Sequence, residues 1–132
     1  MRPIVLALSL LLVAALAPAS AAASERCAVS VSPAVVSPTD AVDIVITGVP
    51  VAPNGGSVEI GIDVRRLSTH EGTAYFLFAW PGVTELSLKH NFDYSGENPL
   101  PPMEPGRYLV RVTTPHLHGG CNAVGLFRVV AD

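Results

Sequence analysis

The stretch Val58-Glu59-Ile60-Gly61-Ile62-Asp63-Val64-Arg65 decides the fold class of this chain. β-Branched residues occupy every second position, and polar residues or glycine stand between them. This alternation is typical of a strand that buries one face, whereas a helix places its apolar residues three and four positions apart. The stretch therefore predicts a β-strand that packs one side against a core.

Alternating or β-branched runs recur along the rest of the chain. They predict further strands at residues 28–32, 42–47, 74–80, 85–89, 108–114 and 126–130. The segments between these runs hold most of the Pro and Gly, the residues that favour turns. Seven short strands at such spacing predict an all-β domain, a single seven-stranded antiparallel β-sandwich.

The first 23 residues predict an export signal. Arg2 precedes an apolar stretch at residues 4–17, and Pro18 and a run of Ala and Ser follow it. A basic start, an apolar centre and a small-residue end are typical of a secretory signal peptide. The strongly apolar part, roughly 14 residues, is shorter than the roughly 20 that span a bilayer. We expect cleavage before Ser24, a secreted or periplasmic domain at residues 24–132, and no membrane span after cleavage. The alternative is an uncleaved anchor, since no charge occurs between Arg2 and Glu25.

Composition and charge exclude several classes of function. The whole chain is 49% hydrophobic and 14% charged, and the signal segment accounts for much of the apolar excess. No run of basic residues occurs, which argues against a nucleic-acid or anionic-membrane partner. No nucleophile-elbow, zinc-protease or phosphate-binding glycine pattern is found, so we expect a non-catalytic protein.

Cys27 and Cys121 are the only cysteines, and export places them in an oxidising compartment. If the predicted strands alternate in direction, the start of the first strand and the turn before the last strand lie at the same end of the domain. We therefore expect a Cys27–Cys121 disulfide. A reactive thiol pair would be expected to have a C-x-x-C spacing, which is absent.

Histidines provide the only metal-ligating pattern. His116 and His118 stand two residues apart, and on an extended segment both rings lie on one face, where they can chelate Cu(II) or Zn(II). Glu59 and Glu85 are the nearest expected carboxylates, whereas His70 and His90 belong to the opposite end. The interpretation we favour is a pair of polar residues on an exposed loop pinned by the disulfide, with no cofactor.

Aromatic residues gather at positions 75–80. Tyr75 and Leu77 face one way, and Phe76, Phe78 and Trp80 face the other way. Burial of the larger set is the interpretation we favour. In the alternative, Tyr75 fills the core and the larger set forms an exposed strip for a partner. The long segment 91–105, with Phe92 and Tyr94, is a second candidate surface.

The segment Pro105-Gly106-Arg107-Tyr108-Leu109-Val110-Arg111-Val112, with the closing Phe127-Arg128-Val129-Val130, resembles the last two strands of immunoglobulin-like and fibronectin type III-like domains of bacterial secreted proteins. The resemblance implies an immunoglobulin-like sandwich. It also implies that Tyr108 packs beneath a corner made by the Pro-Gly pair and bonds back to the chain through its hydroxyl.

A second resemblance concerns small periplasmic copper-binding sandwiches of the CopC type. Tyr108-x-Val110, then His118, then Gly125-x-Phe127 are similar to the end of that family. The family uses a histidine at the start of the mature chain as a copper ligand, and here Ser24-Glu25-Arg26-Cys27 stands there.

Together the patterns predict a small secreted binding or structural protein with an unidentified protein or carbohydrate partner. A copper- or zinc-binding protein that uses His116 and His118 is the alternative.

Overall fold

The computed structural model describes residues 27–93, 95–117 and 120–132. The predicted signal segment, Tyr94 and His118 lie outside these residues. The described chain contains eight strands and no helix, which confirms the all-β prediction. The strands are β1 (Ala28–Ser32), β2 (Val35–Val36), β3 (Val42–Thr47), β4 (Val58–Arg66), β5 (Gly72–Ala79), β6 (Glu85–His90), β7 (Gly106–Thr113) and β8 (Asn122–Val129).

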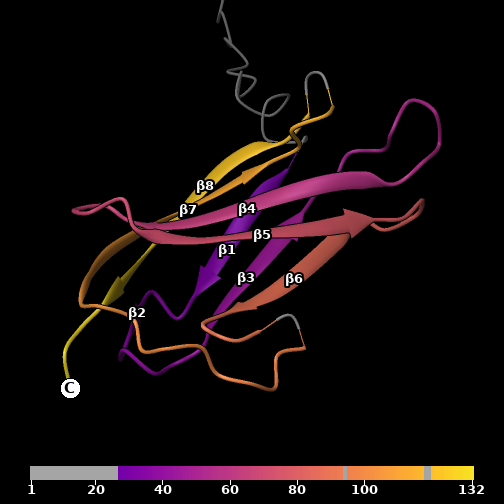
Figure 1. Ribbon diagram of the computed structural model, residues 1–132. Helices are drawn as coiled ribbons and strands as arrows, with labels where there is room; N and C mark the ends of the chain where they lie inside the picture. Colours follow the sequence, from indigo (N-terminus) through magenta and orange to yellow (C-terminus); the bar gives the residue numbers. More distant parts are fainter. Residues whose placement is uncertain (1–26, 94, 118–119) are drawn as a thin grey trace, which may run out of the picture.

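The strands form two sheets that face each other (Figure 1). One sheet has three strands in the order β1-β3-β6, and the other has five in the order β2-β8-β7-β4-β5. Alternate residues of each sheet meet in the shared core. The side chains buried almost completely are Val42, Ile44, Ile46, Ile60, Ile62, Val64, Val110, Val112 and Val129. The alternation in the sequence therefore identified the inner face of β3, β4 and β7.

The prediction of seven strands, all antiparallel, is wrong because of β2. Pro33 follows β1 and has no N–H for a ladder, so pairing with β3 ends there. The chain then crosses to the other sheet, where β2 runs parallel to β8. The N–H groups of Arg128 and Val130 donate to the carbonyl oxygens of Ala34 and Val36 at 2.8 and 2.9 Å. The five-stranded sheet is therefore mixed.

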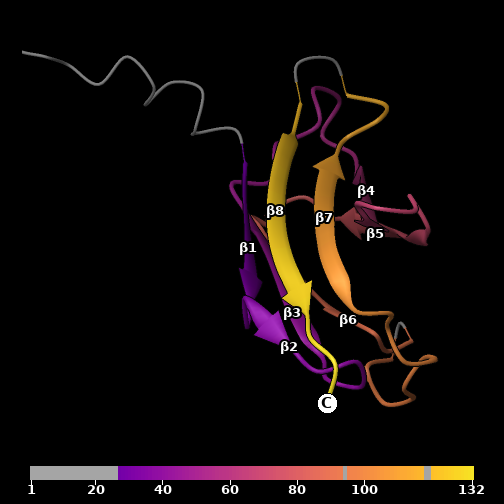
Figure 2. The same cartoon turned by 90° about the vertical axis from the view of Figure 1, so that its left-hand side faces the viewer.

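The last strand is also longer than predicted, because it starts at Asn122 instead of residue 126. Gly125 interrupts its apolar pattern in the sequence. In the structure β8 lies next to β1, as Figure 2 shows, and a Cβ on Gly125 would lie 2.7 Å from a methyl carbon of Val31. Glycine at this position therefore permits the close approach of two strands that belong to different sheets.

Two predicted tertiary contacts are confirmed. Cys27 and Cys121 form a disulfide with a Cα–Cα distance of 5.5 Å, joining the start of β1 to the residue before β8. The Tyr108 hydroxyl donates to the carbonyl oxygen of Glu104 at 2.7 Å. The Tyr108 ring also stacks on Phe127, with ring centroids 5.0 Å apart. Both contacts fix the two C-terminal strands.

Candidate functional site

The aromatic residues of β5 and the turn after it point mainly to solvent. Phe76, Phe78 and Trp80 are 53%, 55% and 68% exposed, whereas Tyr75 is 3% exposed. The favoured prediction that the larger set is buried is therefore wrong. Burial of Tyr75 is possible because its hydroxyl lies 2.8 Å from Nδ1 of the buried His90, within hydrogen-bond distance. His90 thus gives the hydroxyl of the buried Tyr75 ring a hydrogen-bond partner within the core.

We call Phe76, Phe78 and Trp80 the aromatic strip. Phe76 is paired in register with Gly61, and a Cβ on Gly61 would lie 3.8 Å from ring atom Cε1 of Phe76. The ring therefore reaches over a position of β4 that has no side chain. Phe78 is paired in register with Glu59 on β4. The strip is continuous with the outer face of the five-stranded sheet.

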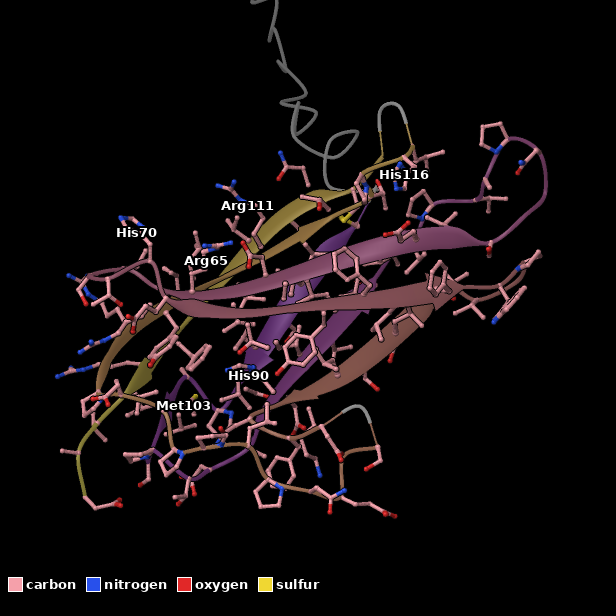
Figure 3. The ribbon with its side chains drawn as sticks, in the orientation of Figure 1. Arg65, His70, His90, Met103, Arg111 and His116 are labelled. Atoms are coloured by element: carbon pink, nitrogen blue, oxygen red, sulfur yellow. A yellow bond between two sulfur atoms is a disulfide. The ribbon has the colours of Figure 1, made fainter. Side chains whose placement is uncertain are left out.

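Four arginines lie on this same outer face: Arg65 on β4, Arg107 and Arg111 on β7, and Arg128 on β8. All are exposed and alternate with core residues of their strands. Arg107 is directly opposite Arg128, and Arg111 is directly opposite Asp63. Figure 3 shows Arg65 and Arg111 on the side of the sheet away from His90.

Only one of these arginines has an ion pair within the described residues. The Asp63 carboxylate pairs with Nε of Arg65 at 2.5 Å. Arg107, Arg111 and Arg128 have no ion-pair partner there. The sequence did not indicate this cluster, because its members come from alternate positions of three strands. Period two predicts which residues point outward, but not which strands are neighbours.

His116, the candidate metal ligand that the structure describes, lies beside Glu59 at one end of β4. Nε2 of His116 is 3.1 Å from Oε2 of Glu59, in agreement with the expected neighbourhood of the two residues. They line a groove of about 420 Å³ together with Ala52, Pro53, Asn54, Ser57, Val58 and Leu117. His118, the second predicted ligand, lies outside the described residues. No group of three or more His, Cys, Asp or Glu side chains suited to a metal occurs among the residues that are described.

The other two histidines are remote from His116. His70 lies in the turn between β4 and β5, at the end of β4 opposite Glu59. His90 is buried at the end of β6, and burial lowers its pKa from 6.5 to about 4. Figure 3 shows His70, His90 and His116 well separated. Neither His70 nor His90 can complete a site at His116.

Part of the long segment before β7 is held by polar contacts of Asp93, and its ends bond to the loop after β2, where the N–H of Met103 donates to the carbonyl oxygen of Pro38 at 2.8 Å. The Asp93 carboxylate accepts hydrogen bonds from the Ser95 hydroxyl at 2.5 Å and from the Asn98 amide at 2.6 Å. These hydrogen bonds lower the pKa of Asp93 to about 2, with the bond from Ser95 contributing most and the bond from Asn98 next. Phe92 is half-buried with Lys89 Nζ 5.5 Å from its ring centroid. Phe92 therefore offers less surface than the aromatic strip, and Tyr94 lies outside the described residues.

No helix long and apolar enough to cross a membrane occurs in the part of the chain that the structure describes.

No protein-family model matches the chain, and no curated protein matches it. Several solved structures are similar in fold. A Pseudomonas fluorescens alkylpurine DNA glycosylase, AlkC, bound to DNA with an abasic site analog, is 16% identical with a TM-score of 0.50. The similarity covers 79% of this chain and 30% of the glycosylase chain. A β-glucosidase from Erythrobacter marinus is 12% identical with a TM-score of 0.50, over 78% of this chain and 15% of its own.

The chain thus spans less than a third of either protein, and both similarities concern the fold alone. The CARDB domain of a Pyrococcus furiosus protein, in complex with di-metal ions, is 16% identical with a TM-score of 0.45. That similarity covers 80% of this chain and 92% of the domain.

Proposed function

We propose that this protein is a secreted, non-catalytic binding module with an immunoglobulin-like fold. It holds a protein or carbohydrate partner on the outer face of its five-stranded sheet, and the aromatic strip is the centre of the contact. The observation that carries this proposal is the exposure of Phe76, Phe78 and Trp80 while Tyr75 fills the core. Large aromatic residues that project from a rigid sheet supply contact area with little loss of side-chain entropy on binding.

The fold supports this role in two ways. The disulfide and the Tyr108 hydroxyl bond both fix the C-terminal strands of the sheet that presents the strip. Phe76 and Phe78 lie on β5, whose inner face is anchored by Tyr75 and Ala79, each 3% exposed. A partner therefore meets a strand whose backbone is anchored by its buried face, so binding requires little ordering of the backbone.

A double substitution, Phe76→Ser with Phe78→Ser, tests the proposal. Both side chains are about half exposed, so we expect the fold to remain while partner binding falls at least tenfold, as for loss of a hot-spot pair. The measurement is affinity capture from the extracellular and periplasmic fractions of the source cells, with quantitative mass spectrometry of bound protein and glycan.

Val51→Ser is the matched control, because Val51 is 74% exposed and lies in the loop before β4. The control should capture the same partners as the unaltered protein. Equal capture by the Phe76→Ser/Phe78→Ser variant and the unaltered protein would contradict the proposal.

The second candidate function is copper or zinc binding at His116. The observation in its favour is the 3.1 Å contact between His116 Nε2 and the Glu59 carboxylate, two groups that suit Zn(II) or Cu(II). Titration with each metal should then give micromolar or tighter binding that is lost on His116→Ala/His118→Ala substitution. His70→Ala is the control, and unchanged binding in the double variant would dismiss this candidate.

A further inference from the structure

The arginines of the outer face give the molecule an uneven charge. The structure describes six Lys and Arg side chains, and four of them, Arg65, Arg107, Arg111 and Arg128, lie on this one face. Two carboxylates, those of Glu59 and Asp63, accompany them. The formal net charge of the chain is nevertheless −3, so the rest of the surface is acidic. An acidic partner is therefore attracted to this face and repelled elsewhere.

Two of the arginines form an unusual cross-strand pair. Arg107 and Arg128 stand directly opposite each other on β7 and β8, and neither has an ion pair within the described chain. Like charges directly opposite on a sheet destabilise it. Both also line an open groove with Pro105, Gly106 and the end of β8. A carboxylate placed between the two guanidinium groups would pair with both.

A second groove of the face separates Arg65 from Arg111. It has a volume of about 300 Å³, and Asp63, Arg66, Leu67, His70 and Leu109 also line it. Asp63 neutralises Arg65 in part, whereas Arg111 is unpaired within the described residues. The face therefore offers a second position for a carboxylate, beside Arg111.

The apolar neighbours of these arginines indicate the kind of partner. Val124 and Leu126 are 57% and 60% exposed on β8, and they are paired in register with Arg111 and Leu109. Protein interfaces contain more arginine and aromatic side chains, and less lysine, than the rest of a protein surface. This face has the same composition, since its basic residues are all arginine and lie among exposed aromatic and aliphatic side chains. Nucleic acid is a poorer match, because Glu59 and Asp63 lie within the face and would face its phosphates.

We propose that the outer face of the five-stranded sheet docks an acidic protein, whose carboxylates pair with Arg107, Arg111 and Arg128 and whose apolar side chains cover Val124 and Leu126. This inference rests on the proposed binding function and defines the chemistry of the partner. The aromatic strip, on the same face, completes the apolar part of the contact.

The test uses a soluble peptide of Glu with interspersed Leu, and a matched peptide with Lys in place of Glu. NMR titration of the isotope-labelled protein should show binding of the Glu peptide, with shifts on β7 and β8, and none of the Lys peptide. Arg107→Gln with Arg128→Gln should weaken binding about tenfold, the sum expected for two exposed charge pairs. The melting temperature should not fall, because the substitution removes a repulsion.

Lys89→Gln is the matched control, since Lys89 is a cation on the three-stranded sheet. It should leave the affinity for the Glu peptide unchanged. An equal loss in this control, or no binding of the Glu peptide, would overturn the inference. Tighter binding of a DNA duplex or of phosphatidylglycerol vesicles would also overturn it, and so would self-association that Arg107→Gln/Arg128→Gln abolishes.

The same variants separate this inference from the function on which it rests. A natural partner that is lost with Phe76→Ser/Phe78→Ser but kept by Arg107→Gln/Arg128→Gln would overturn the acidic partner and support the binding module. A partner lost with both variants supports both proposals.

Discussion

Replacement of both cysteines, Cys27→Ala with Cys121→Ala, should lower the free energy of unfolding by about 4 kcal/mol. The bridge joins residues 94 positions apart, so it closes nearly the whole described domain into one loop. Without it the unfolded chain gains the conformational freedom of that loop, and the folded state loses its relative advantage. A loss of this size should lower the melting temperature by roughly 20 °C for a domain of about 100 residues.

Urea titration and thermal melting followed by circular dichroism measure the effect. Reduction of the unaltered protein with dithiothreitol is the matched control, because it opens the same loop and keeps both sulfur atoms. The two treatments should agree closely. Equal stability of the oxidised protein and the double variant would show that the loop closure contributes nothing.

Lowering the pH from 6.5 to 4 should reduce the free energy of unfolding, because the unfolded chain protonates His90 and the folded chain does not. The contribution of His90 by itself should reach about 3 kcal/mol at pH 4. Burial lowers the pKa of this histidine to about 4 in the folded state, against 6.5 in the unfolded chain. In that window the unfolded chain binds more protons than the folded one, so stability falls as the pH falls. The neutral ring suits its surroundings, with the Tyr75 hydroxyl 2.8 Å from Nδ1 and the Phe127 ring beside it.

Urea titrations at several pH values measure this slope, and His90→Gln should abolish it between pH 6.5 and about 5, where His90 dominates. His70→Gln is the control, because His70 is exposed, and it should keep the full slope. A groove beside His90 is lined by three charged residues, Arg66, Glu71 and Glu104. All titrations are made at the same ionic strength, so that the effect of these charges on His90 stays the same. The lowered pKa of Asp93 has the same sign of effect, but stability is lost through Asp93 only below about pH 5, so this loss overlaps the lower end of the window and remains in His90→Gln. A slope unchanged in His90→Gln would contradict the assignment to His90.

Sequence patterns predicted the elements well because period two is a local property. The alternation in residues 58–65 gave β4 and its inner face, and the two cysteines gave the bridge between β1 and β8. The positions of β2 and of the start of β8 were missed. β2 has only two residues and no periodicity, and Gly125 hides the pattern of β8. Both depend on contacts with strands that are distant in the sequence.

The candidate site was less predictable, since it depends on which face of β5 is buried. Phe76, Phe78 and Trp80 together have more apolar surface than Tyr75 and Leu77, so composition favoured the wrong face. The hydrogen-bond partner of Tyr75 is His90, fifteen residues further along the chain, and alternation within β5 cannot reveal it. The cluster of four arginines was missed for the same reason. Glu59 and His116 were placed correctly because strand direction alone brings them to one end.

The disulfide also decides how a stretching force would pass through the molecule. Tension applied at Cys27 and at the C-terminal end of β8 runs across the sulfur–sulfur bond to Cys121 and then along β8 to Val129. Residues 28–120 lie within the covalent loop, so the covalent load path bypasses them. While the bridge is intact, the aromatic strip and the strands beneath it stay outside the load path, and only β8 and its neighbours resist the pull. Reduction would shift the load to β1, which is paired with β3 in the other sheet.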